Sequence, residues 1–282
     1  MLPSLPSFLR LFELPLAIAA GIMEEKFWEA AYVGDAVRLK NVLQSQGTVD
    51  INWRKKADGM RSPLHVSCWS GHEATTVLIL ACPGVEVNGK DTGGRTPFWW
   101  ACNEGFLACV RLLLKDPRVM VNEPDSEGCT PLRQAVHYKR HEIVRWWIAS
   151  GREMDFGQPG ISQTDIMGQA VRKKEDGMVR LLKRFKNNPE ETRFEVRIGL
   201  CWHAEAAAEI FALVVFVSDG LLEIRNPDLA TAEQASRFFF IATQLPLELQ
   251  VVLCFRLVGS AKEVISGRDS EAAFQALAKL LL

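Results

Sequence analysis

Residues 96–105 read TPFWWACNEG, and this stretch decides the fold because the chain repeats its pattern. A Ser or Thr followed by Pro stands at Ser62-Pro63, Thr96-Pro97 and Thr130-Pro131, with a step of 34 residues each time. A further 34 residues reaches Thr164, where the hydroxyl remains and the Pro is lost. Self-similarity at a period of about 33–34 residues indicates stacked helical repeats.

Each repeat carries the signals of a helix pair. The Thr is a helix N-cap, and the Pro that follows fits the first helical position, where its missing N–H would be unpaired. Gly71 and Gly105 end the first helix where the chain turns sharply. Lys139 stands at the same position in the third repeat, which predicts a strained or altered turn. The second helices are apolar runs, as expected of helices packed between neighbours: 76–80, 110–114 and 144–148.

The three aligned segments resemble ankyrin repeats. The family pattern is roughly D-x-x-G-x-T-P-L-H-x-A-x-x-x-G-H, followed by a second apolar helix and V-N. Matching stretches are Ser62-Pro63-Leu64-His65 with Gly71-His72, Asp91 to Phe98 with Gly105, Asp125 to Leu132, and the pairs Val87-Asn88 and Val121-Asn122. The resemblance implies an all-α solenoid of helix pairs with β-hairpin-like loops, and hydrogen bonds from His65 and His72 to neighbouring repeats.

The same register predicts the domain organisation. Residues 24–187 form an array of about five units, with degenerate repeats at both ends, and residues 1–23 form a leader. The leader is too short and too interrupted by charge to span a membrane. It is either a loose segment or an amphipathic helix over the first repeat; residues 14–20 also resemble a short secretory signal. Residues 188–198 are a polar linker.

Residues 199–282 predict a separate α-helical domain, in which residues 206–217 form an apolar helix too short to cross a bilayer. Within it, Leu245-Pro246-x-Glu248-Leu249 with Leu253 and Leu257 weakly resembles the opening of an F-box. That motif docks the Skp1 adaptor of cullin ubiquitin ligases. An alternative role is therefore a substrate-recruiting ligase adaptor.

Composition limits the function classes. A hydrophobic content of 48% supports a packed core, and a net charge of −1 argues against a strongly electrostatic nucleic-acid partner. Seven cysteines without a C-x-x-C pair predict buried, reduced thiols and a reducing compartment. We therefore expect a cytoplasmic location, with a nuclear one as the alternative.

Catalytic motifs are lacking. The chain has no Gly-rich phosphate loop, no G-x-S-x-G and no H-E-x-x-H, so we expect no catalytic residues and no cofactor. Cys201 and His203 lie close in sequence, but residues two apart on a helix diverge, which disfavours a thiol hydrolase. His137 and His141 have the spacing of a metal pair, but no further ligand joins them, so we expect no metal site.

The functional surface follows from the resemblance. In ankyrin arrays the concave face comprises the hairpin tips and exposed positions of the first helices. The equivalent helix positions here are Tyr32; Val66, Trp69 and Ser70; Trp100, Asn103 and Glu104; and Gln134, His137 and Tyr138. The tips add Trp53, Arg54, Lys90 and Arg95, with acidic Glu123 and Glu127 at the third tip. Aromatic residues and Arg dominate binding hot spots, so this face predicts a non-enzymatic module that binds a partner protein.

Overall fold

The computed structural model describes residues 21–45, 49–161 and 165–218, together with Gln250 and Cys254. Most of the predicted leader, the F-box-like segment at 245–257 (apart from those two residues) and the later predicted helices lie outside the described residues.

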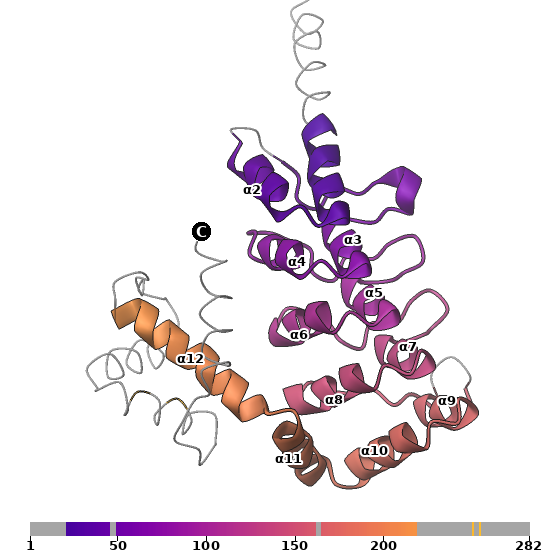
Figure 1. Ribbon diagram of the computed structural model, residues 1–282. Helices are drawn as coiled ribbons and strands as arrows, with labels where there is room; N and C mark the ends of the chain where they lie inside the picture. Colours follow the sequence, from indigo (N-terminus) through magenta and orange to yellow (C-terminus); the bar gives the residue numbers. More distant parts are fainter. Residues whose placement is uncertain (1–20, 46–48, 162–164, 219–249, 251–253, 255–282) are drawn as a thin grey trace, which may run out of the picture. The chain divides into compact units, whose positions relative to one another are not determined.

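Five helix pairs follow one another along the chain (Figure 1). They are 21–33 with α2 (Ala36–Gln44), α3 (Pro63–Ser70) with α4 (Glu73–Leu80), α5 (Pro97–Glu104) with α6 (Leu107–Lys115), α7 (Pro131–His137) with α8 (His141–Ser150), and α9 (Ile166–Arg172) with α10 (Asp176–Asn187). The first helices α3, α5, α7 and α9 pack on one another in sequence, and α2, α4, α6 and α8 form a second layer. The described ranges contain no β-strand, only an isolated bridge between Lys55 and Arg61. The all-α repeat architecture is confirmed.

Helix caps form as the repeat pattern predicts. The Thr96 hydroxyl accepts a hydrogen bond from the Trp99 backbone N–H at 3.1 Å. Gly71 ends α3 with a left-handed φ of +77°. A Cβ at Gly71 would also come within 2.2 Å of the Phe106 ring, so this turn needs glycine for both conformation and space.

Lys139 takes the same turn without a glycine. Its φ is +59°, a conformation that is costly for a residue with a Cβ. Helix α5 ends at Glu104, directly before Gly105, whereas α7 ends at His137, two residues before Lys139. The Lys139 ammonium lies 2.6 Å from a Glu175 carboxylate oxygen in the next repeat. The predicted strained turn is confirmed.

One position in the first helix of each of the first three repeats ties that repeat to the next loop. These side chains donate to backbone carbonyls: Trp28 to Arg61 (2.9 Å), His65 to Arg95 (3.1 Å) and Trp99 to Cys129 (3.1 Å). The Nδ1 atom of His65 accepts the Ser62 backbone N–H, which leaves the proton on Nε2 for the inter-repeat bond. Burial lowers the pKa of His65 to about 4. Tryptophan at 28 and 99 thus replaces histidine because its indole supplies the same N–H donor.

His72 makes a second contact of this kind. Its Nε2 atom lies 3.0 Å from the Tyr32 carbonyl oxygen of the preceding repeat. With His65, this confirms the prediction that both histidines hydrogen-bond between repeats.

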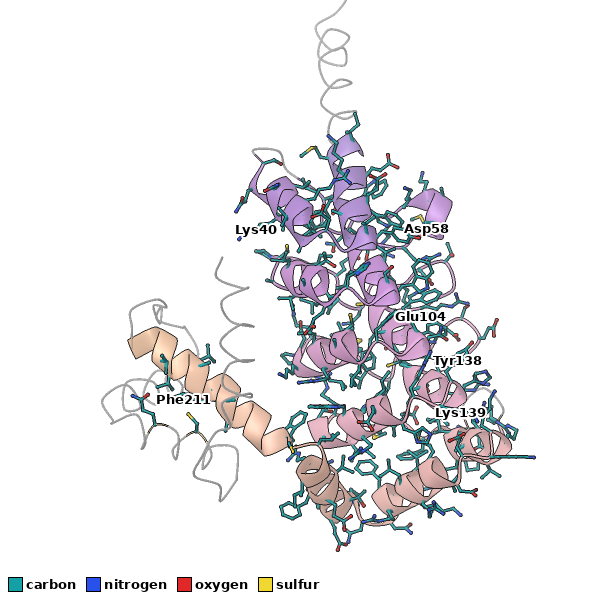
Figure 2. The ribbon with its side chains drawn as sticks, in the orientation of Figure 1. Lys40, Asp58, Glu104, Tyr138, Lys139 and Phe211 are labelled. Atoms are coloured by element: carbon teal, nitrogen blue, oxygen red, sulfur yellow. The ribbon has the colours of Figure 1, made fainter. Side chains whose placement is uncertain are left out.

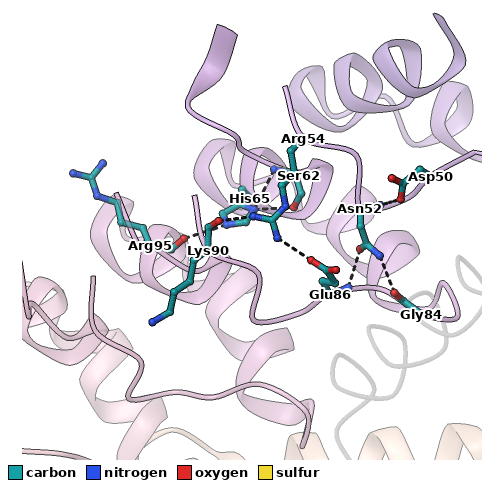
Figure 3. Close-up of polar contacts among 9 residues, drawn as sticks. All are labelled: Asp50, Asn52, Arg54, Ser62, His65, Gly84, Glu86, Lys90 and Arg95. Atoms are coloured by element: carbon teal, nitrogen blue, oxygen red, sulfur yellow. Dashed lines mark hydrogen bonds and ion pairs between the residues drawn. The ribbon is translucent and has the colours of Figure 1, made fainter. Parts of the chain in front are cut away.

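A ladder of asparagines connects the loops on the other side of each pair (Figure 3). The Asn52 amide donates to the Gly84 carbonyl at 2.9 Å and accepts the Glu86 N–H at 2.8 Å. Asn88 and Asn122 repeat the pattern one and two repeats later, Asn88 with Arg118 and Met120 (2.7 Å each) and Asn122 with Glu153 and Asp155 (3.4 and 3.2 Å). Because each Asn satisfies a donor and an acceptor of the next loop, the loops keep one spacing without forming strands.

The core lies between the two helix layers and between successive repeats. Trp147 is fully buried, meets Phe98 edge-on at 5.1 Å between ring centroids, and donates to the Glu153 carbonyl at 3.1 Å. Trp146 is also buried. The two tryptophans fill interior space, as the sequence predicts. Burying such an indole contributes about 3 kcal/mol or more.

The chain divides into two compact units between Arg193 and Phe194. This division falls within α11 (Pro189–Gly199), which occupies the segment predicted as a linker. Arg193 belongs to the first unit: its guanidinium donates to the Ile148 carbonyl at 3.3 Å and lies over the Phe185 ring. The second unit contains α12 (Trp202–Ser218). Among the described helices, none combines the length and apolar character of a membrane span.

Candidate functional site

The first helices and the loops that precede them form one face of the array, here called the loop-side face. Asp58, Glu104, Tyr138 and Lys139, from three successive repeats, lie along this side, and Lys40 of α2 lies on the other (Figure 2). The loop-side face comprises the elements to which the sequence analysis assigned the concave face. Neighbouring loops are joined at their tips by backbone bonds from Thr92 to Gly59 and from Ser126 to Gly93.

A continuous row of rings crosses the first three repeats on this face. We call it the aromatic file; it comprises Trp28, Tyr32, Trp69, Trp100 and Trp99. Successive ring centroids are 5.4, 5.8, 6.3 and 5.1 Å apart. The first two pairs are stacked and the last two meet edge-on, the two arrangements that ring quadrupoles favour.

Three cations lie against the aromatic file. The Lys55 ammonium is 4.5 Å from the Trp28 ring centroid. The Arg61 guanidinium lies 4.9 Å from Trp69 and 5.3 Å from Trp100. The Arg95 guanidinium lies 4.9 Å from both Trp99 and Trp100. Such contacts hold the long side chains in place and keep positive charge on the surface of the file.

The predicted site residues fall into three groups by exposure. The exposed ones are Tyr32 (42%), Tyr138 (48%) and Lys90. The partly exposed ones are Trp53, Arg54, Trp69, Ser70, Arg95, Asn103, Glu104 and His137. The buried ones are Val66 (0%), Trp100 (9%) and Gln134 (8%).

The prediction that Val66, Trp100 and Gln134 are exposed is therefore wrong. The three residues share one register, 34 residues apart, and that register packs against neighbouring repeats. Trp100 is covered by Trp69, Trp99 and the two arginines, and its Nε1 donates to an Asp91 carboxylate oxygen at 3.0 Å. Trp100 is thus a buried member of the aromatic file, in contact with the Trp69 and Trp99 rings.

The charged tips are tied to one another. Arg54 pairs with Glu86 at 2.8 Å and donates to the Lys90 carbonyl (Figure 3). Lys90 pairs with Glu123 of the next tip at 2.8 Å. The basic-to-acidic gradient of the tips therefore includes an ion pair between repeats, and Arg54 and Lys90 hold the loops as well as presenting charge.

Farther along the face, His137 and Tyr138 continue the surface with more polar groups. The Gln169 side chain lies 2.7 Å from His137 Nδ1, and burial, with Lys173 and Arg133 nearby, lowers the pKa of His137. His141 lies 2.7 Å from a Glu175 oxygen. The described part of the chain holds no group of three or more side chains suited to a metal ion.

Cys201 differs from the other cysteines. It is exposed, whereas Cys68, Cys82, Cys102, Cys109, Cys129 and Cys254 are buried; all seven are free. Cys201 precedes α12 in a left-handed conformation with φ of +53° and accordingly does not share a helix with His203. The side chain of His203 lies outside the described residues.

Residues missed by the sequence analysis complete the site. Trp28 and Trp99 belong to the aromatic file, and Lys55, Arg61 and Asp91 contact its members. Two of these residues could have been found from the sequence. Trp28 and Trp99 stand at the repeat position of His65, whose side chain donates a hydrogen bond to the next loop.

Comparison with known proteins identifies the array. Residues 64–158 match the family description "Ankyrin repeats (3 copies)". These residues are ankyrin repeats. Ankyrin repeats indicate a protein–protein interaction module, and proteins of this type are generally non-enzymatic. No curated protein matches this chain.

Proposed function

We propose that the ankyrin array binds a partner protein through the loop-side face, with the aromatic file as the central contact. The observation that carries this proposal is the continuity of the file across three repeats. Its members at Tyr32 and Trp69 reach the surface, and Tyr138 adds an exposed ring farther along. A row of large rings held in fixed positions buries much area with few torsions to freeze.

The rigidity of the face supports the same conclusion. Tyr32 is stacked on both sides, by Trp28 and Trp69, and its backbone carbonyl accepts from His72. The loops are fixed by the asparagine ladder and by tip-to-tip bonds. A preorganised surface loses little conformational entropy on binding, which favours affinity.

The test compares loop-side variants with a variant of the opposite layer. Full-length wild type, Tyr32→Ala, Trp69→Ala and Val37→Ala would be used for affinity capture from the native cell with quantitative mass spectrometry. Val37 is 71% exposed on α2 and is the matched control for loss of an apolar surface side chain. A partner that is retained by Val37→Ala and lost by the other two supports the proposal.

The captured partner would then be purified and titrated against each variant. We expect Trp69→Ala to weaken binding by about 30-fold, the value typical of a hot-spot aromatic. Unchanged affinity for both Tyr32→Ala and Trp69→Ala would show that the loop-side face is not the binding surface.

A further inference from the structure

Arg95 carries a positive charge that the described fold does not neutralise. Its guanidinium makes no ion pair and donates no hydrogen bond within the described residues. In Figure 3 the backbone carbonyl of Arg95 meets His65, whereas the guanidinium points away from the other residues drawn. Nε is buried without an acceptor, and the two Nη atoms are not among the buried unpaired atoms, so they reach the surface.

The Asp91 carboxylate, which lies in the same loop, accepts hydrogen bonds from other groups. Asp91 Oδ1 accepts the backbone N–H groups of Gly93 and Arg95, at 2.8 and 2.9 Å. Asp91 Oδ2 accepts the indole N–H of Trp100 at 3.0 Å. Asp91 therefore shapes the loop and orients Trp100, and it forms no direct ion pair with the Arg95 guanidinium.

The equivalent position one repeat earlier shows what a neutralised arginine looks like. Arg61 stands 34 residues before Arg95 and also lies against Trp100, but its Nη2 atom pairs with Asp58 at 3.1 Å. One repeat later the position is Cys129, which has no charge. Among these three equivalent positions only Arg95 presents an unpaired guanidinium.

We propose that Arg95 binds a carboxylate of the partner, so that the loop-side face selects a protein segment with an Asp or Glu beside the apolar side chain that contacts Trp69. This inference rests on the proposed function. The indoles of Trp99 and Trp100 hold the guanidinium, so little side-chain freedom is lost when a carboxylate is bound. The planar fork then donates two charge-assisted hydrogen bonds.

The surroundings favour a carboxylate over a more highly charged phosphate. Asp58, Asp91 and Glu104 all lie on the loop-side face and repel a dianion more strongly than a monoanion. Arg95 supplies a single guanidinium here, whereas phosphate recognition favours several converging cations.

The test uses a phage-displayed library of random linear peptides, selected on the immobilised full-length chain. We expect the enriched peptides to share an Asp or Glu at a fixed distance from an aromatic or aliphatic residue. Synthetic peptides with Glu→Gln or Asp→Asn at that place should bind the wild type about tenfold more weakly. Against Arg95→Gln the two peptides should bind equally, which assigns the carboxylate to this arginine.

Two variants sharpen the assignment. Lys56→Gln removes one exposed positive charge from the same side of the array without breaking any ion pair among the described residues, and it should keep the preference for the acid. Arg95→Lys keeps the charge but not the fork, and it should lose most of the preference. If Lys56→Gln and Arg95→Gln reduced the preference for the acidic peptide equally, the inference would be overturned, because the preference would then come from the overall positive charge of the array.

The outcomes separate this inference from the proposed function. Peptides whose binding needs Trp69 but shows no preference for an acid would overturn the role of Arg95. So would an acid preference that is unchanged in Arg95→Gln. Either result would leave the proposal that the loop-side face binds a partner standing. Tighter binding after phosphoserine replaces the acid would overturn the carboxylate assignment. Peptides insensitive to both Trp69→Ala and Arg95→Gln, or no enrichment at all, count against both proposals.

Discussion

Trp100→Ala should destabilise the array by about 3 kcal/mol. The indole is 9% exposed, lies 6.3 Å from Trp69 and 5.1 Å from Trp99, and contacts two guanidiniums. Removing a buried Trp side chain costs about 3–5 kcal/mol through lost apolar contact and the cavity that remains. We take the low end, because water near the surface can replace the lost indole donor to Asp91.

The assay is equilibrium unfolding of the full chain in urea, followed by far-ultraviolet circular dichroism. A lower midpoint with an unchanged slope reports a loss of stability without a change in the surface exposed on unfolding. Tyr138→Ala is the control, because its ring is 48% exposed and it should cost less than about 1 kcal/mol. If Trp100→Ala unfolds within about 1 kcal/mol of the wild type, Trp100 is not a structural support of the aromatic file.

Three further predictions follow from buried or ordered groups. Lowering the pH from 7 to 4 should remove about 3 kcal/mol from the free energy of unfolding, because His65 takes up a proton near pH 6.5 in the unfolded chain but only near pH 4 in the folded one. His65→Asn should flatten this pH dependence of stability. An equally steep profile in the variant would contradict the prediction. Asn88→Ala should lower the free energy of unfolding, measured in urea, by about 2 kcal/mol, because hydrogen bonds of about 1 kcal/mol each to Arg118 and Met120 are lost. The stability of Asn88→Asp should lie between those of Asn88→Ala and the wild type. A thiol reagent at neutral pH should modify Cys201 rapidly and the six other cysteines only on unfolding; fast reaction of further thiols would contradict their burial.

The fold was readable from the sequence because the same local chemistry recurs in each repeat. Thr96 and Pro97 start α5 and Gly105 ends it. The hydroxyl residue and the Pro recur 34 residues earlier and later, and the Gly recurs at Gly71. Even the departure at Lys139 was interpretable, because a turn that needs positive φ constrains whatever residue stands there.

The candidate site was less readable, because exposure in a solenoid depends on neighbouring repeats. Val66 and Trp69 lie one helical turn apart on α3, yet the first is buried and the second reaches the surface. The partners of the arginines were also hidden: Arg61 and Arg95 occupy equivalent positions, and only the three-dimensional structure shows that Asp58 neutralises the first and not the second. Pairings of this kind form across loops and leave no periodic signal.

Positions that repeat and positions that vary have different roles in this array. The donors at 28, 65 and 99 keep one hydrogen bond, so the fold constrains them. The surface register, in contrast, changes from ring to polar group: Tyr32, Trp69, Asn103 and His137. Because this change leaves the scaffold bonds intact, the register is free to encode partner selectivity. If the loop-side face binds as proposed, the apolar part of the partner lies over the first two repeats, and its polar part follows beyond Arg95.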